Sequence, residues 1–296
     1  MRTYPPCIQC ITDVRLRDIR SAAADPDEAI EKQLELLSVI RNEFVRGGEL
    51  TMIASRIFYR LTKIMPEVVE HYRIIKRRAI DDSWKMISKY KKLIEGLDGY
   101  DKFRLAVKIS IAGNAMDTGV AGHEPPKEIS EETILSTPIT VDHTREIYNL
   151  LKEGGHRILW LFDNAGEAVL DTILIGIIRE MGNKVVGAAK EDPGFQNDLT
   201  ISDAEYAGLD KYLDKLISTG YMGSSIHLNR VSNDLLKELK EADIVIAKGM
   251  AHFEYLHEID LGKPTVFLLM PKCDIIALVS GGKKGTYVAL LSKPRK

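Results

Sequence analysis

The apolar positions of this chain follow a helical period in the first half and a mixed strand and helix pattern in the second. Between residues 25 and 112 they recur every three or four residues, which predicts amphipathic helices that pack through one face. We expect long helices at 67–94 and 100–112, the latter closing on Gly113 and Asn114. The helical spacing is clearest in two sets: Ile30, Leu34, Leu37 and Ile40, and Ile53, Ile57, Leu61 and Ile64.

Short apolar runs alternate with helical patterns after residue 156. We expect strands at 157–162, 184–189, 215–218, 243–247 and 264–270, with a further edge strand at 286–291. Helices are expected between them at 166–181, 202–213 and 232–241. This alternation predicts an α/β protein with a mainly parallel sheet and flanking helices. Glycines and prolines interrupt the pattern at 116–143, so we place the boundary there, with a mainly helical N-terminal region at 1–143 and an α/β domain at 144–296.

Composition narrows the classes of partner. The chain has 296 residues and a formal net charge of −2, which argues against broad binding of nucleic acids or membrane surfaces. Apolar runs fall short of the roughly 20 residues that span a membrane, and the start of the chain lacks a signal-peptide core. We therefore expect a cytoplasmic protein with reduced thiols.

The most informative segment joins the expected strand at 157–162 to the helix that follows. Asp163 and Asn164 stand directly after the apolar run, followed by Gly166 and Glu167. Ligands of open α/β sheets bind where parallel strands end at their carboxyl side. A carboxylate and an amide at such a point offer the oxygen ligands that hard divalent ions prefer. Helix capping would explain one of these side chains, but not Asp, Asn and Glu together.

Polar residues also follow the neighbouring strands. Asp198 lies in the loop after the second strand, and Lys248 ends a later one. Two carboxylates and an amide could hold one divalent ion, Lys248 suits a phosphate oxygen, and Gly166 lets helix N–H groups approach an anion. A metal, a lysine and an anion-binding turn together indicate phosphoryl hydrolysis.

Three familiar phosphate-handling patterns are missing from the sequence. No Gly-x-Gly-x-x-Gly follows a strand, and no Gly-x-x-x-x-Gly-Lys-Ser/Thr loop occurs. Phosphatases that form an aspartyl-phosphate usually have Asp-x-Asp after the first strand, but the third position here is Ala165. Direct attack by an activated water is therefore favoured over a covalent intermediate on Asp163.

Several motifs resemble those of the metal-dependent damage-control phosphatases. The segment 163–167 is similar to the Asp-Asn-x-Gly-Glu signature of this family, and 113–117 matches its Gly-Asn-x-x-Asp motif. The segment 248–254 resembles Lys-Gly-x-x-Asn-Phe-Glu, and Lys272-Cys273 matches a C-terminal Lys-Cys pair. Cys7 and Cys10 resemble the Cys pair of a prokaryotic subgroup.

The resemblance implies a helical N-terminal region joined to a Rossmann-like domain that hydrolyses sugar phosphates or damaged phosphometabolites. It implies a divalent cofactor, Mn, Co, Ni or Mg, and it places the metal ligands at Asp163, Asn164 and Asp198. The implied substrate-phosphate contacts are Glu167, Lys248 and Asn114, with Asp117 beside them. His252 departs from the family, which commonly has Asn, and a histidine can titrate near neutral pH.

Other interpretations of the same sequence stay open. Cys7 and Cys10 would fit half of a zinc site, a redox pair or two reduced thiols. An S-adenosylmethionine-dependent carboxyl methyltransferase is a competing enzyme class, although the usual Gly-rich loop is missing. A non-catalytic module that binds small phosphorylated metabolites is the third possibility. The sequence does not specify the oligomeric state.

Overall fold

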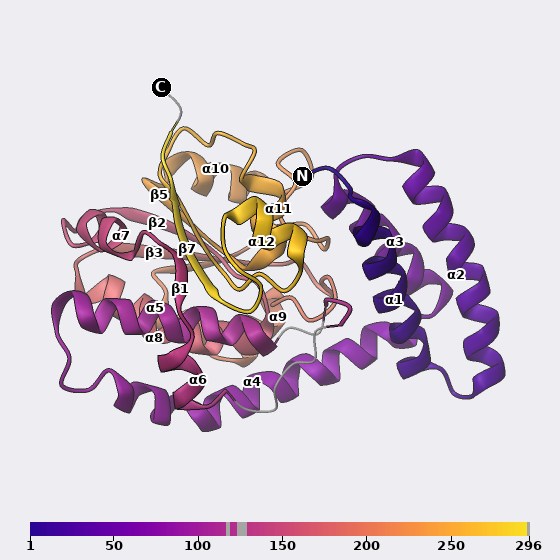
Figure 1. Ribbon diagram of the computed structural model, residues 1–296, viewed down its shortest axis with the longest axis horizontal. Coiled ribbons are helices and arrows are strands. Elements are labelled where there is room, and N and C mark those ends of the chain that lie inside the picture. Colours follow the sequence, from indigo (N-terminus) through magenta and orange to yellow (C-terminus); the bar gives the residue numbers. More distant parts are fainter. Residues whose placement is uncertain (117–118, 123–128, 295–296) are drawn as a thin grey trace.

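The computed structural model describes residues 1–116, 119–122 and 129–294, and within them the chain builds one central sheet (Figure 1). The strand order is β1-β7-β6-β5-β2-β3-β4. Neighbouring strands pair in parallel except β6 and β7, which are antiparallel. The carboxyl ends of β2, β3, β5 and β6 therefore meet at one edge. The strands are β1 (Ile139–Asp142), β2 (Arg157–Leu161), β3 (Lys184–Ala189), β4 (Lys215–Ser218), β5 (Ile244–Lys248), β6 (Thr265–Leu269) and β7 (Tyr287–Ser292).

Side chains of β2 alternate between two buried faces of the sheet, as the strand period requires. Ile158 and Trp160 belong to the core under α8, whereas Leu159 and Leu161 belong to the core under α10, α11 and α12. The helices of this α/β part are α6 (Glu131–Ser136), α7 (Thr144–Leu151), α8 (Ala165–Glu180), α9 (Ile201–Tyr206), α10 (Asn233–Glu241), α11 (Gly249–Leu256) and α12 (Asp274–Ser280).

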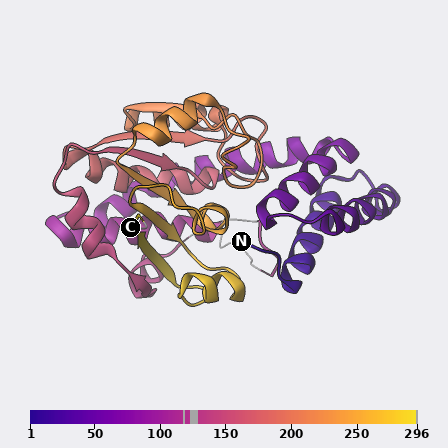
Figure 2. The ribbon, with the colours of Figure 1, turned by 90° about the horizontal axis from the view of Figure 1, so that it is seen from above.

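The N-terminal helices divide into two groups. The first three form a bundle beside the sheet, seen at one side of the molecule in Figures 1 and 2. The next two pack on α8 and cover one face of the sheet. Because α8 is covered on both sides, almost its whole surface is buried, and most of its buried side chains are apolar apart from Glu167, Asp171 and Thr172. The five helices are α1 (Pro5–Ala22), α2 (Pro26–Arg46), α3 (Leu50–Ile64), α4 (Glu67–Leu93) and α5 (Gly99–Gly113).

The predicted fold class is confirmed: helices precede a mainly parallel sheet with helices on both faces. The boundary at residue 143 stays a prediction, since α4, α5 and β1 precede it and pack with the α/β part. No helix in the described ranges is long and apolar enough to cross a membrane.

The structure differs from the sequence-based expectations in several places. The elements that were not predicted are α1, α6, α7, α11, α12 and β1. Because β1 pairs with β7, the predicted edge strand at 286–291 is an inner strand. The helix expected at 202–213 breaks at Gly208, whose φ of 67° is left-handed. In α2 the core face contains Ala29, Leu36 and Ile40, while three other predicted core residues are exposed, Ile30, Leu34 and Leu37.

Candidate active site

Asp163 and Asn164 lie at the carboxyl end of the buried strand β2. Asn164 occupies the N-cap position of α8, but its side chain makes no capping hydrogen bond. Its amide nitrogen instead donates to Asp163 Oδ2 and to Glu167 Oε2, both at 2.9 Å. Asn164 therefore orders two carboxylates, which capping alone would not explain.

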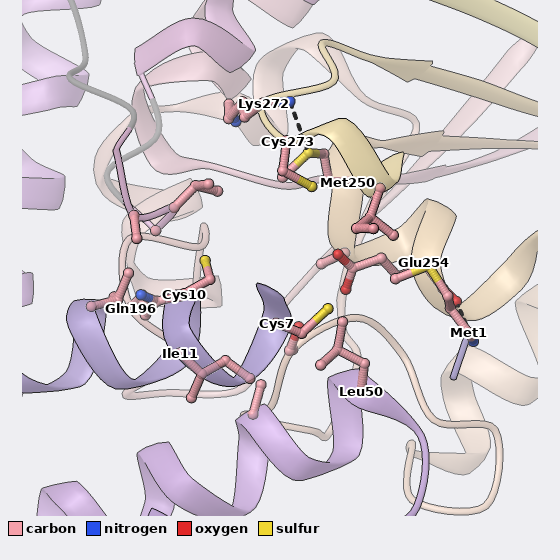
Figure 3. Close-up of a pocket in the computed structure, with 18 of the residues that line it drawn as sticks. Met1, Cys7, Cys10, Ile11, Leu50, Gln196, Met250, Glu254, Lys272 and Cys273 are labelled. Carbon is pink, nitrogen blue, oxygen red and sulfur yellow. Dashed lines mark hydrogen bonds between the residues drawn. The ribbon is translucent and has the colours of Figure 1, made fainter. Parts of the chain in front are cut away.

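The loop between β3 and α9 brings Asp198 to the same place. Asp198 forms an antiparallel bridge with Asn164, and the backbone N–H of Leu199 donates to the carbonyl of Asp163 at 2.7 Å. Asn197 donates from its side chain to Asn164 Oδ1 at 2.8 Å. The three metal ligands implied by the sequence thus line one cavity of about 260 Å³, shown in Figure 3.

Gly249 leaves the space that the Asp163 carboxylate occupies. Its φ is +74°, and a Cβ at this position would lie 1.8 Å from Asp163 Oδ2. The residues present suit a hard divalent ion, because two carboxylates and an amide oxygen come from two backbone-linked segments. The role of these three side chains as ligands remains a prediction.

Lys248 lies beneath the site in a buried ion network. Its Nζ is 2.9 Å from Glu167 Oε1 and 2.9 Å from Asp171 Oδ1, and it donates to Ser110 Oγ at 2.6 Å. Burial alone would lower the pKa of Lys248, but the two carboxylates outweigh burial and raise it. Burial also raises the pKa of Asp171 to about 6, although Lys248 opposes this shift.

Three predicted phosphate contacts, Lys248, Glu167 and Asn114, do not line the cavity. Asn114 is fully buried and donates to Asp163 Oδ2 at 2.8 Å and to Glu167 Oε2 at 2.9 Å. Gly166 packs against α4, where an added Cβ would lie 3.0 Å from Ala79 Cβ. These contacts give each residue a structural role, and their phosphate contacts stay predictions. Asp117 lies outside the described residues.

Two lysines at strand ends were not singled out for chemistry from the sequence. Lys272, just after β6, lines the cavity and donates to Asn114 Oδ1 at 3.2 Å. Lys190, just after β3, has its Nζ 3.8 Å from Asp198 Oδ2. Burial lowers the pKa of Lys190 to about 8, while Asp198 and Asp163 oppose that shift. The strand-end argument that selected Lys248 applies equally to both.

His252 is a buried structural link between α11 and β2. Its Nε2 lies 3.1 Å from the Phe162 carbonyl, and its Nδ1 lies 3.2 Å from Ser225 Oγ. Burial, assisted by Lys190, lowers the pKa of His252 to about 3. Burial disfavours the charged ring, so His252 does not have the near-neutral pKa of an unperturbed histidine.

We expect His252→Asn to flatten the acid dependence of stability. The native pKa lies below the unfolded value, so the contribution of His252 is present above pH 6.5 and is lost as pH falls toward 3. As pH falls through that window, the free energy of unfolding of the variant should decrease by up to about 1.4 kcal/mol less per pH unit than that of the wild type. Urea unfolding at pH 7, 6, 5 and 4 measures this, with His257→Asn as a control. Equal slopes in wild type and His252→Asn would contradict the assignment.

The three cysteines, Cys7, Cys10 and Cys273, are free and line the cavity (Figure 3). Burial raises the pKa of each thiol, which disfavours the thiolate form. Among the described residues, no group of three or more His, Cys, Asp or Glu side chains could hold a metal ion.

Comparisons with known proteins show relatives over almost the whole chain. Residues 3–288 match the family model of the damage-control phosphatase ARMT1-like domain. A damage-control phosphatase of Archaeoglobus fulgidus is 30% identical over 292 residues, which cover 98% of this chain and 99% of that protein. One from Pyrococcus horikoshii is 30% identical over 295 residues, 99% of each chain. The crystal structure of a DUF89 family protein from P. horikoshii matches with a TM-score of 0.83, 29% identity and full coverage of both chains.

Proposed function

Because the chain belongs to the damage-control phosphatase family, which supports a phosphatase role, we propose that it hydrolyses small phosphate monoesters with the help of a divalent ion. Asp163, Asn164 and Asp198 would hold the ion, with Mn, Co, Ni and Mg as the candidates. The observation that carries this proposal is the convergence of these side chains and Lys272 on one cavity.

We assign two kinds of role to the residues in and beneath the cavity, namely contact with the phosphoryl group and positioning of the metal-binding side chains. A divalent ion in such a site would polarise a phosphoryl oxygen of the substrate and activate a water molecule. Lys272 is a buried cation on the cavity wall, and we assign it to the phosphoryl oxygens, where it offsets charge that develops during hydrolysis. Glu167 accepts from Asn114 and Asn164, and it pairs with Lys248. We therefore assign Glu167 and Lys248 as positioning residues that fix the orientation of the metal-binding side chains.

The proposal is tested by hydrolysis of phenyl phosphate with metal-stripped protein, before and after separate addition of Mg, Mn, Co and Ni. We expect no turnover without metal and restored turnover with at least one ion. Turnover that is equal with and without metal would contradict metal dependence. Folded protein that binds metal but hydrolyses no phosphate ester would favour a binding module or, if S-adenosylmethionine binds in calorimetry, a methyltransferase.

A further inference from the structure

Helix α1 forms the wall of the cavity that faces the sheet edge. One stripe of α1 lines it, with the helical spacing of i, i+3, i+4, i+7 and i+8: Cys7, Cys10, Ile11, Val14 and Arg15. Asp163 and Asn164 line the same cavity from the end of β2. A phosphate ester whose phosphoryl group lies at the sheet edge would therefore extend its remaining atoms toward α1. Arg15 is the one charged side chain in that stripe.

Arg15 is held rigidly and keeps one donor group unused. The residue is 3% exposed, and its Nη2 lies 3.2 Å from Asp18 Oδ2. Its guanidinium carbon lies 4.9 Å from the ring centroid of Phe58 and 5.6 Å from that of Phe195. Within the described part of the chain, Nη1 is buried and has no hydrogen-bond partner. A buried donor that lacks a partner destabilises the folded protein, so such a group calls for a ligand.

The position of Arg15 is tied to the loop that contains Asp198. Phe195, against which Arg15 packs, accepts a backbone hydrogen bond from Asp198 at 3.0 Å. Asp18, the partner of Arg15, accepts from the Tyr72 hydroxyl at 2.7 Å. Gln196 also lines the cavity and donates to the same hydroxyl at 3.5 Å. Helix α1 and the loop at 195–198 therefore form one connected unit, which fixes the guanidinium relative to the candidate metal ligands.

We propose that Arg15 binds a second acidic group of the substrate, so that the preferred substrates are phosphate monoesters with an additional carboxylate or phosphate. The inference rests on the proposed phosphatase function and adds the substrate class to it. A guanidinium recognises either oxyanion through paired N–H groups, and the two flanking aromatic rings hold its plane in place. The rest of the α1 stripe is apolar or thiol-bearing, so it offers no competing charge.

Matched aryl phosphates test this inference. We would compare kcat/KM for phenyl phosphate, 4-carboxyphenyl phosphate and 1,4-phenylene bisphosphate in wild type and Arg15→Gln. The wild type should prefer at least one acid-bearing ester by roughly 10- to 100-fold, the range expected for a hydrogen bond to a charged group. Arg15→Gln should lose that preference, so that its kcat/KM values for the three esters agree within about threefold. The two acid-bearing esters distinguish carboxylate from phosphate recognition.

Two further variants distinguish the loss of acid recognition from a general disturbance of folding. The double variant Arg15→Gln/Asp18→Asn replaces both members of the buried pair and leaves no uncompensated charge. Arg20→Gln changes an exposed arginine on the same helix and should keep the preference. A preference that survives in the double variant, or an equal loss for all three esters, would overturn the assignment of Arg15.

A binding readout separates failure of this inference from failure of the proposed function. Thermal unfolding with 4-carboxyphenyl phosphate or the bisphosphate should raise the Tm of wild type more than phenyl phosphate does, and this difference should vanish in the double variant. If the wild type hydrolyses none of the esters but shows the difference, the phosphatase proposal fails and Arg15 still binds the acid. Equal Tm shifts for all three esters in wild type would overturn the role of Arg15.

Discussion

Asp163→Asn is expected to lower kcat/KM for phenyl phosphate by roughly 10³-fold or more while the protein stays folded. The change keeps the size of the side chain but removes one of the two negative charges that would hold the proposed ion. Asp163 Oδ2 also accepts hydrogen bonds from Asn114 and Asn164, so the substitution disturbs the alignment of neighbouring groups. Steady-state hydrolysis at saturating Mn measures the loss in activity, and calorimetry measures the accompanying loss in Mn affinity.

Asp274→Asn is the matched control for this variant. Asp274 lines the same cavity but is exposed, at the start of α12, and it has no place in the proposed metal site. We expect its activity and Mn affinity to remain within about threefold of wild type, as for surface substitutions of modest effect. If Asp163→Asn kept wild-type activity and Mn affinity, Asp163 would not be a metal ligand.

Lys248→Met is expected to lower the free energy of unfolding by about 3–5 kcal/mol, the range for breaking a buried ion pair by removing one partner. Lys248 is fully buried, and its ammonium lies 2.9 Å from each of two carboxylates, Glu167 and Asp171. Without the cation these buried carboxylates repel each other and must take up protons or water. Urea unfolding at pH 7, monitored by circular dichroism, measures the change.

Lys215→Met provides the control for a half-exposed lysine whose partner keeps a second cation. Lys215 is 2.7 Å from the buried Glu238, which also pairs with Arg157. Removal of Lys215 should therefore cost no more than about 1 kcal/mol. The double variant Lys248→Met/Asp171→Asn should recover part of the lost stability, because it leaves one fewer buried charge. A stability of Lys248→Met within 1 kcal/mol of wild type would contradict the buried-network interpretation.

The convergence of Asp163, Asn164 and Asp198 could be predicted because it follows from topology. Parallel strands end at a common edge, and two of these residues directly follow a recognisable buried strand. The roles of the lysines could not be separated in the same way. All three lysines stand at or just after strand ends: Lys190, Lys248 and Lys272. What distinguishes Lys248 from Lys272 is tertiary packing, because α5 and α8 enclose Lys248 whereas Lys272 lines the cavity. That packing depends on contacts between distant segments.

The sequence pattern did not reveal β1 and α1 for similar physical reasons. β1 is four residues long and pairs with β7, about 150 residues later, so local periodicity carries little signal for it. The cavity-facing stripe of α1 mixes thiols, apolar side chains and a buried arginine, which weakens the apolar pattern that identifies a helix. The unpartnered donor of Arg15 depends on this packing. The sequence therefore indicated the chemistry at the sheet edge but not the opposite wall.

A crystal structure of the protein soaked in Mn, with anomalous scattering measured at the Mn absorption edge, tests the proposed metal site directly. We expect one strong anomalous peak within roughly 2.0–2.6 Å of oxygen atoms from Asp163, Asn164 and Asp198. Asp163→Asn crystals treated identically should lack the peak. A Mn-dependent phosphatase whose anomalous peak lies elsewhere, with these three side chains free of metal, would show that they are not the metal ligands.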